Sequence, residues 1–205
     1  MRGYVAKNNR HGQAEILKDL ELDRIYRQLQ SDSHRLFFNI ARYTGERFGA
    51  ICQLQVCDVY VCYSGIKEPL NEITFRAMTR KASPNGERKT RQAYVCDRLR
   101  EYLSSYRGEL GKVYLFPSSI KKDDPITFSA ADKWLRTAVD RAGLEHRGIS
   151  THTFRRSFIT KLYEEGALDI YAIQQLIGHA SILTTQRYLG VSKQKIQSAM
   201  NRIYN

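Results

Sequence analysis

The chain has 205 residues, of which 42% are hydrophobic, enough apolar material for one compact domain with an extension. No run approaches the roughly 18 to 20 apolar residues of a membrane span, which argues against a membrane-embedded protein. Lysine and arginine number 33 against 21 aspartate and glutamate, and the resulting formal charge of +12 favours a polyanionic partner, above all nucleic acid.

The sequence predicts a mainly helical chain. Residues 1–17 open with a basic, polar stretch, so we expect a flexible arm there and one domain over 18–205. Apolar residues at helical spacing predict amphipathic helices over 19–30 and 34–43. With Asp97, Ser129 and Asp169 as expected N-caps, capping and periodicity predict further helices, over 97–107, 130–143, 152–166, 170–177 and 192–204.

A short stretch of the chain alternates in polarity, as half-buried strands do. NEITFRAM (71–78) and RQAYV (91–95) read as two strands joined by the turn KASPNGERK (81–89), which has Pro-Asn-Gly at its centre. KVYLF (112–116) is a third candidate strand. The fold class expected is therefore α+β, mainly α-helical with a small three-stranded antiparallel sheet.

The cysteines raise the question of a metal site. Cys52, Cys57 and Cys62 are evenly spaced and Cys96 follows, but no C-x-x-C pair is present. The first three alternate with apolar residues, so we expect buried, reduced thiols, as in the cytoplasm, rather than zinc ligands.

Four short motifs carry the chemistry, and each alone would be weak evidence. They are Thr44-Gly45-Glu46-Arg47, His152-Thr153-Phe154-Arg155, Gly178-His179 and Tyr188, nine residues after His179. On a helix His152 and Arg155 project from one face. In this order and spacing the motifs resemble those of the tyrosine recombinases, the phage-integrase family, across most of the chain.

The residue types suit phosphoryl transfer. Two guanidiniums, from Arg47 and Arg155, can grip the non-bridging oxygens of a phosphodiester and stabilise the extra charge of its transition state. The imidazoles of His152 and His179 can donate hydrogen bonds or move a proton at neutral pH. The pKa of a tyrosine hydroxyl is near 10 in water, so Tyr188 needs such a cationic site to attack.

The resemblance implies the catalytic-domain fold of that family and a site-specific DNA recombinase. Such an enzyme cleaves and rejoins strands through a 3′-phosphotyrosyl intermediate, here on Tyr188. Because the covalent link conserves the bond energy, no metal or other cofactor is expected. The implied partners are double-stranded DNA with specific recombination sites and further copies of the chain, up to a tetramer, in the cytoplasm.

The family also places a general-acid lysine in the hairpin, and two residues compete for that role here. Lys81, at the end of the first strand, matches the family's position better than Lys89. The hairpin is strongly basic, which suits contact with the DNA backbone. The expected DNA-binding residues are Arg76, Arg80, Arg88, Lys89 and Arg91 of the hairpin, together with Arg156.

Several features depart from the family or leave alternatives open. Ala50 stands where an acid is common, and Arg156 replaces a histidine. The additional DNA-binding domain that most members carry before the catalytic one is not expected within this chain. A type IB topoisomerase, which would relax supercoils without paired sites, and a non-enzymatic DNA-binding module are the rival functions. The apolar stripe of 191–205 could dock on its own domain or on a neighbouring copy.

Overall fold

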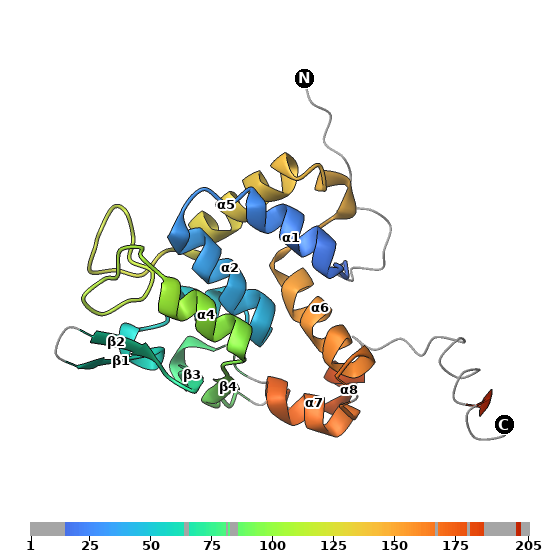
Figure 1. Ribbon diagram of the computed structural model, residues 1–205. Helices are drawn as coiled ribbons and strands as arrows, with labels where there is room; N and C mark the ends of the chain where they lie inside the picture. Colours follow the sequence, from blue (N-terminus) through green and yellow to red (C-terminus); the bar gives the residue numbers. More distant parts are fainter. Residues whose placement is uncertain are drawn as a thin grey trace. The chain divides into compact units, whose positions relative to one another are not determined.

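The computed structural model describes residues 15–63, 66–80, 82, 86–166, 168–179, 181–186 and 200–201. The chain divides into two compact units, Met1–Phe158 and Ile159–Asn205, and helices dominate both (Figure 1). Within the described ranges, no helix is long and apolar enough to cross a membrane.

The helices of the first unit follow the predicted order, apart from a short helix over residues 48–52 that was not predicted. They are α1 (Asp19–Arg27), α2 (Asp32–Thr44), α3 (Phe48–Cys52), α4 (Asp97–Ser105), α5 (Phe128–Arg141) and the start of α6 (Thr151–Glu164), with the 3-10 turns η1 (Val56–Asp58), η2 (Ala77–Thr79) and η3 (Glu145–Arg147). Two expected caps are wrong. Asp97 is the first residue of α4, which Cys96 precedes, and Ser129 lies inside α5, where the Thr127 side chain accepts the N–H of Ala130 instead.

The strands form two separate antiparallel pairs among the described residues. They are β1 (Tyr60–Tyr63) with β2 (Ile66–Pro69), and β3 (Glu72–Phe75) with β4 (Arg91–Tyr94). The two predicted strands of the basic hairpin are confirmed in β3 and β4, but the three-stranded sheet is wrong. Residues 112–116 contribute only an isolated bridge from Tyr114 to Gln55, because a turn closed by Gly111 N–H and Tyr114 O interrupts them.

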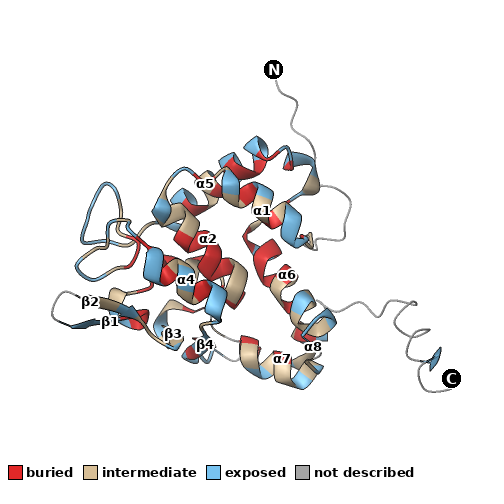
Figure 2. Cartoon of the chain, viewed as in Figure 1, coloured by how far each residue is buried: buried red, intermediate tan, exposed pale blue. Residues whose placement is uncertain are grey.

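An aromatic core holds the first unit together. Phe37 and Phe48 pack edge to face at 4.9 Å, and Phe154 at the start of α6 packs at 4.9 Å against Phe38. The buried faces of the helices turn toward this core (Figure 2). Leu17 also joins it, with its N–H bound to Ser157 Oγ at 2.8 Å, so residues 15–17 of the expected arm lie in packed structure.

The expectation of buried thiols holds for one cysteine. Cys52 is buried in α3, whereas Cys57, Cys62 and Cys96 are exposed. Cys62 lies in β1, which buries only its first residue, and this explains why apolar alternation misled the prediction there.

In the second unit α7 (Ile170–Ile177) packs against α8 (Ile182–Gln186). The predicted cap is confirmed, since Asp169 Oδ1 accepts the N–H of Ala172 at 2.8 Å. Ile173 and Ile177 are buried. The helix predicted over 192–204 lies almost wholly outside the described residues.

Candidate active site: a buried carboxylate among arginines

Thr44–Arg47 forms a tight turn between α2 and α3. Gly45 ends α2 in the left-handed region, at φ 62°, where a side chain would be strained. Thr44 Oγ1 donates to the carbonyl of Ile40 at 2.6 Å and accepts the N–H of Glu46 at 3.2 Å. The turn therefore sends Glu46 into the interior and leaves Arg47 at the start of α3.

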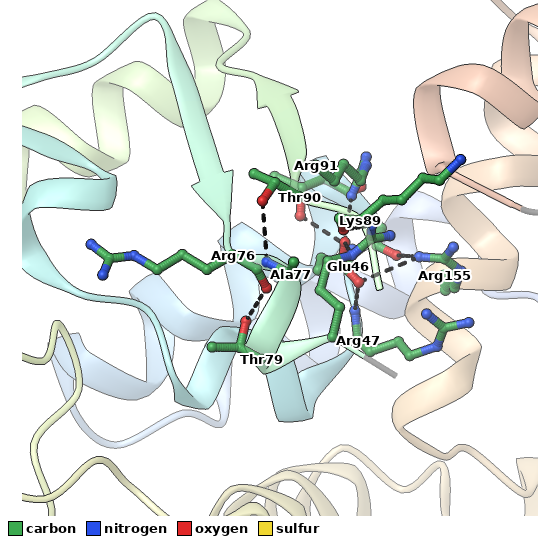
Figure 3. Close-up of polar contacts among 12 residues, drawn as sticks. Glu46, Arg47, Arg76, Ala77, Thr79, Lys89, Thr90, Arg91 and Arg155 are labelled. Atoms are coloured by element: carbon green, nitrogen blue, oxygen red, sulfur yellow. Dashed lines mark hydrogen bonds and ion pairs between the residues drawn. The ribbon is translucent and has the colours of Figure 1, made fainter. Parts of the chain in front are cut away.

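The Glu46 carboxylate is fully buried and is surrounded by basic groups (Figure 3). Its Oε2 lies 3.0 Å from Arg91 Nη1 and 3.5 Å from Arg80 Nε. Its Oε1 accepts the backbone N–H of Arg47 at 2.9 Å and lies 3.7 Å from Arg155 Nη1. One carboxylate thus contacts three guanidinium groups that come from separate parts of the chain.

Arg91 reaches this cluster because it lies on the buried face of its strand. In β4 Arg91 and Ala93 face the interior, and Arg91 pairs in register with Phe75 of β3. Its guanidinium lies 5.9 Å from the centre of the Phe75 ring and donates from Nη2 to the carbonyl of Thr44 at 2.8 Å. The hairpin is thereby tied to the end of α2.

The charges of the cluster do not cancel. Burial raises the pKa of Glu46, but the nearby Arg91, Arg155 and Arg80 lower it more, so its net pKa lies below the ordinary value and the group stays ionised. Burial lowers the pKa of Arg80 and Arg91, and Glu46 opposes that effect. Three guanidiniums against one carboxylate leave positive charge in excess, which favours an anionic ligand.

The two arginines predicted to bind phosphate lie at this cluster. Arg155 is only 1% exposed, and its Nη1 donates to the carbonyl of Gly45 at 3.0 Å. Arg47 is half-buried, and no described residue forms a hydrogen bond or ion pair with its guanidinium. Figure 3 shows its side chain extending toward the side on which Arg155 lies.

The connection between β3 and β4 is anchored at its root. Arg80 Nη1 donates to the carbonyl of Lys89 at 2.7 Å, which holds the two ends of the connection together. The Lys89 side chain is 81% exposed. Lys81, the preferred general acid, lies outside the described residues.

The residues predicted to bind DNA fall into two groups. Arg88 and Lys89 are exposed at the connection. Arg76 is partly exposed and pairs with the buried Asp58 at 2.8 Å, and Arg156 is half-buried. By contrast, Arg80 and Arg91 are buried against Glu46.

The histidines occupy different environments. His152 is exposed in the first turn of α6. His179 of the second unit is buried just after Gly178, which ends α7 at φ 67°, and its Nδ1 lies 2.9 Å from Thr185 Oγ1. That contact fixes the orientation of the ring. Tyr188 lies outside the described residues, two positions beyond the end of α8.

Sequence reasoning missed Glu46. The residue stands inside the first motif, where only Arg47 was assigned a role, while the expected acidic position holds the buried Ala50. One signal was available: in an alternating strand Arg91 lies on the same face as the apolar Ala93, and the polar Gln92 lies on the opposite face. The apolar face of a strand is buried, so an arginine on that face requires a buried acidic partner.

Comparisons with known proteins agree with the family that the motifs resemble. A model of the Phage integrase family matches residues 15–195. Tyrosine recombinase XerC of Halalkalibacterium halodurans is 27% identical over 193 residues, which cover 89% of this chain and 59% of that protein. The chain thus spans about three fifths of the length of this curated relative.

Solved structures share the fold. The crystal structure of XerA recombinase has a TM-score of 0.70 at 23% identity and covers 94% of this chain and 66% of its own. XerH site-specific recombinase bound to difH substrate has a TM-score of 0.65 at 22% identity and covers 91% of this chain and 53% of its own. The expected catalytic-domain fold is therefore confirmed, and since the family model matches most of its length, the chain belongs to the phage integrase family.

Proposed function

We propose that the chain is the catalytic part of a site-specific DNA recombinase that cleaves and rejoins strands through a 3′-phosphotyrosyl intermediate on Tyr188. One observation carries the proposal: the Glu46 carboxylate binds the backbone N–H of Arg47 and lies 3.7 Å from the Arg155 guanidinium, so two separate motifs converge on a cluster in which basic groups outnumber the acid. This concentration of guanidinium groups suits a phosphodiester whose charge increases during reaction.

The reaction conserves atoms and charge. The Tyr188 hydroxyl oxygen attacks phosphorus, and the bond from phosphorus to the 5′-bridging oxygen breaks. The departing oxygen takes a proton from Lys81, with Lys89 as the second candidate, and the DNA 3′ end stays on the tyrosine. Arg47 and Arg155 hold the non-bridging oxygens, and His152 and His179 supply hydrogen bonds or accept the tyrosine proton. Attack by another strand's 5′-hydroxyl reverses each step and completes the exchange.

The proposed substrate is duplex DNA that carries a recombination site. The XerH structure holds difH substrate, and the charge of +12 on this chain suits the same class of partner. Exchange between two duplexes breaks four strands, and each break uses its own tyrosine, so up to four copies act together. Such a protein works on DNA in the cytoplasm.

A nicked trapping substrate tests the proposal directly. A pool of labelled duplexes with randomised sequence and a nick just beyond each possible cleavage position is incubated with the 205-residue chain. Cleavage releases a short fragment that diffuses away, so the covalent intermediate cannot rejoin. We expect a protein–DNA adduct that survives denaturing electrophoresis and whose DNA reveals the preferred site. A wild-type chain that forms no adduct while binding the pool would overturn the proposal.

A further inference from the structure

The Glu46 carboxylate joins two parts of the site that are distant in the sequence. Its Oε1 faces Arg155 of α6, and its Oε2 faces Arg80 and Arg91, which flank the connection between β3 and β4. Since both oxygens belong to one planar group, neither part can shift without weakening an ion pair. The carboxylate therefore links the hairpin to Arg155 within the first unit (Figure 3).

The same connection carries both lysines considered as general acid. Lys81 directly follows Arg80 in the sequence, and the carbonyl of Lys89 accepts the Arg80 Nη1 hydrogen bond at 2.7 Å. Arg80 in turn lies 3.5 Å from Glu46. A chain of contacts thus runs from the carboxylate to the root of the segment that bears the proton donor.

Stability alone gives little reason for a carboxylate at this position. Buried ion clusters add little to stability compared with a well-packed apolar core, because the charged groups lose their hydration. Orientation gives a stronger reason, since guanidiniums crowded without a fixed acceptor would repel one another. Glu46 supplies such an acceptor, and its carboxylate also accepts the backbone N–H of the adjacent Arg47.

We infer that Glu46 is a positioning residue for strand cleavage. Its carboxylate aligns Arg155 and the hairpin lysine on the same scissile phosphate. The inference rests on the proposed recombinase function. Glu46 itself touches neither the phosphate nor the reacting atoms in this scheme. Its removal should slow the chemical step rather than weaken binding to DNA.

The test separates the rate of cleavage from the fraction of active protein. Glu46→Gln keeps the shape of the side chain and removes its charge. We expect a single-turnover rate constant for adduct formation on the trapped nicked duplex about 10- to 100-fold below wild type, because small misplacement of catalytic groups has effects of that size. Affinity for the same duplex should stay unchanged.

A double variant covers the case in which the single variant folds poorly. Glu46→Gln combined with Arg91→Gln removes one negative and one positive charge, so the cluster keeps its wild-type net charge. Replacing both partners of a buried pair is far better tolerated than removing one. If Glu46 positions Arg155 and Arg80, the double variant should fold well and still cleave slowly.

Glu21→Gln provides a matched control on α1. Glu21 Oε1 pairs with Arg147 and its Oε2 accepts the N–H of Lys18 at 3.0 Å, so it also combines an arginine ion pair with a backbone hydrogen bond, although it has one arginine partner where Glu46 has three. We expect this variant to lower the midpoint of thermal unfolding or the active fraction, with an unchanged rate constant. A double variant that folds and cleaves at the wild-type rate, or a Glu46→Gln protein that loses only active fraction, would overturn the inference. Absence of any wild-type adduct would instead overturn the proposed function, and the inference with it.

Discussion

Arg155 donates a 3.0 Å hydrogen bond to the carbonyl of Gly45, across a separation of 110 positions in the sequence. The acceptor lies at the left-handed residue that ends α2, one position before Glu46 and two before Arg47. This turn thus supplies the Gly45 carbonyl and the Glu46 carboxylate to Arg155, and Arg47 belongs to the same turn. The geometry of residues 44–47 therefore controls how both arginines are presented.

Gly45→Ala should destabilise the protein. The residue has φ 62°, and a β-carbon there would lie 2.5 Å from Phe158 Cδ1, so strain and a steric clash act together. We expect a loss of about 2 to 4 kcal/mol in the free energy of unfolding, measured by urea denaturation. Gly49→Ala is the control, because a β-carbon in α3 meets nothing within 4 Å and should stabilise the helix by about 0.5 to 1 kcal/mol. Equal effects of the two substitutions would contradict this account of the turn.

Tyr188→Phe should abolish covalent attachment to DNA and leave affinity nearly unchanged. Phenylalanine keeps the aromatic ring and removes only the attacking oxygen. A denaturing gel of the nicked-duplex reaction measures the adduct, and a gel-shift titration measures affinity. An adduct formed by the variant would show that another residue is the nucleophile.

Lys81→Ala should slow cleavage while binding is mostly kept, and a modified substrate should restore the rate. A 5′-bridging sulfur departs without a proton, so a variant that lacks only the general acid cleaves such a substrate normally. Single-turnover cleavage of the sulfur and oxygen substrates provides the comparison. Lys89→Ala, tested in parallel, should show no such rescue; rescue in that variant alone would assign the proton donor to Lys89.

Replacing both Arg88 and Lys89 by glutamine should weaken binding to all DNA sequences alike. Both side chains are exposed at the hairpin, where they can reach phosphates without entering the buried cluster. Each lost phosphate contact should reduce the slope of log affinity against log salt by about 0.9. Filter binding between low and moderate salt measures the slope, and an unchanged slope would place the hairpin away from the backbone.

The ionised Glu46 should make stability sensitive to acid. Burial raises the pKa of Glu46, and Arg91, Arg155 and Arg80 lower it more, so the folded-state pKa lies below the ordinary 4.5. A depressed carboxyl pKa contributes stability that is complete above the unfolded-state value and is lost as pH falls through the folded-state value. Urea unfolding at a series of pH values from 7 to 3 should therefore show a larger loss for wild type than for the Glu46→Gln, Arg91→Gln double variant. Parallel curves would contradict the ionised state of the buried group.

The features that could be predicted from the sequence are those that depend on local interactions. The capping residue Asp169 and apolar residues at helical spacing located α7, and alternating polar and apolar residues located β3 and β4. These signals act over a few neighbouring residues. The order of the motifs from Thr44 to Tyr188 identified the family, since each motif is contiguous in the chain.

Which charged residues are buried, and how the strands pair, depends instead on contacts between distant parts of the chain. Arg91 and Glu46 are 45 positions apart, and neither neighbourhood in the sequence shows that they meet. Arg80 and Arg91 lie in the interior, because the desolvation of their charges is offset by a carboxylate supplied from the end of α2, and their contact with DNA stays a prediction. Likewise, residues 112–116 have strand-like composition but form no strand, since strand pairing depends on partners that are distant in the chain.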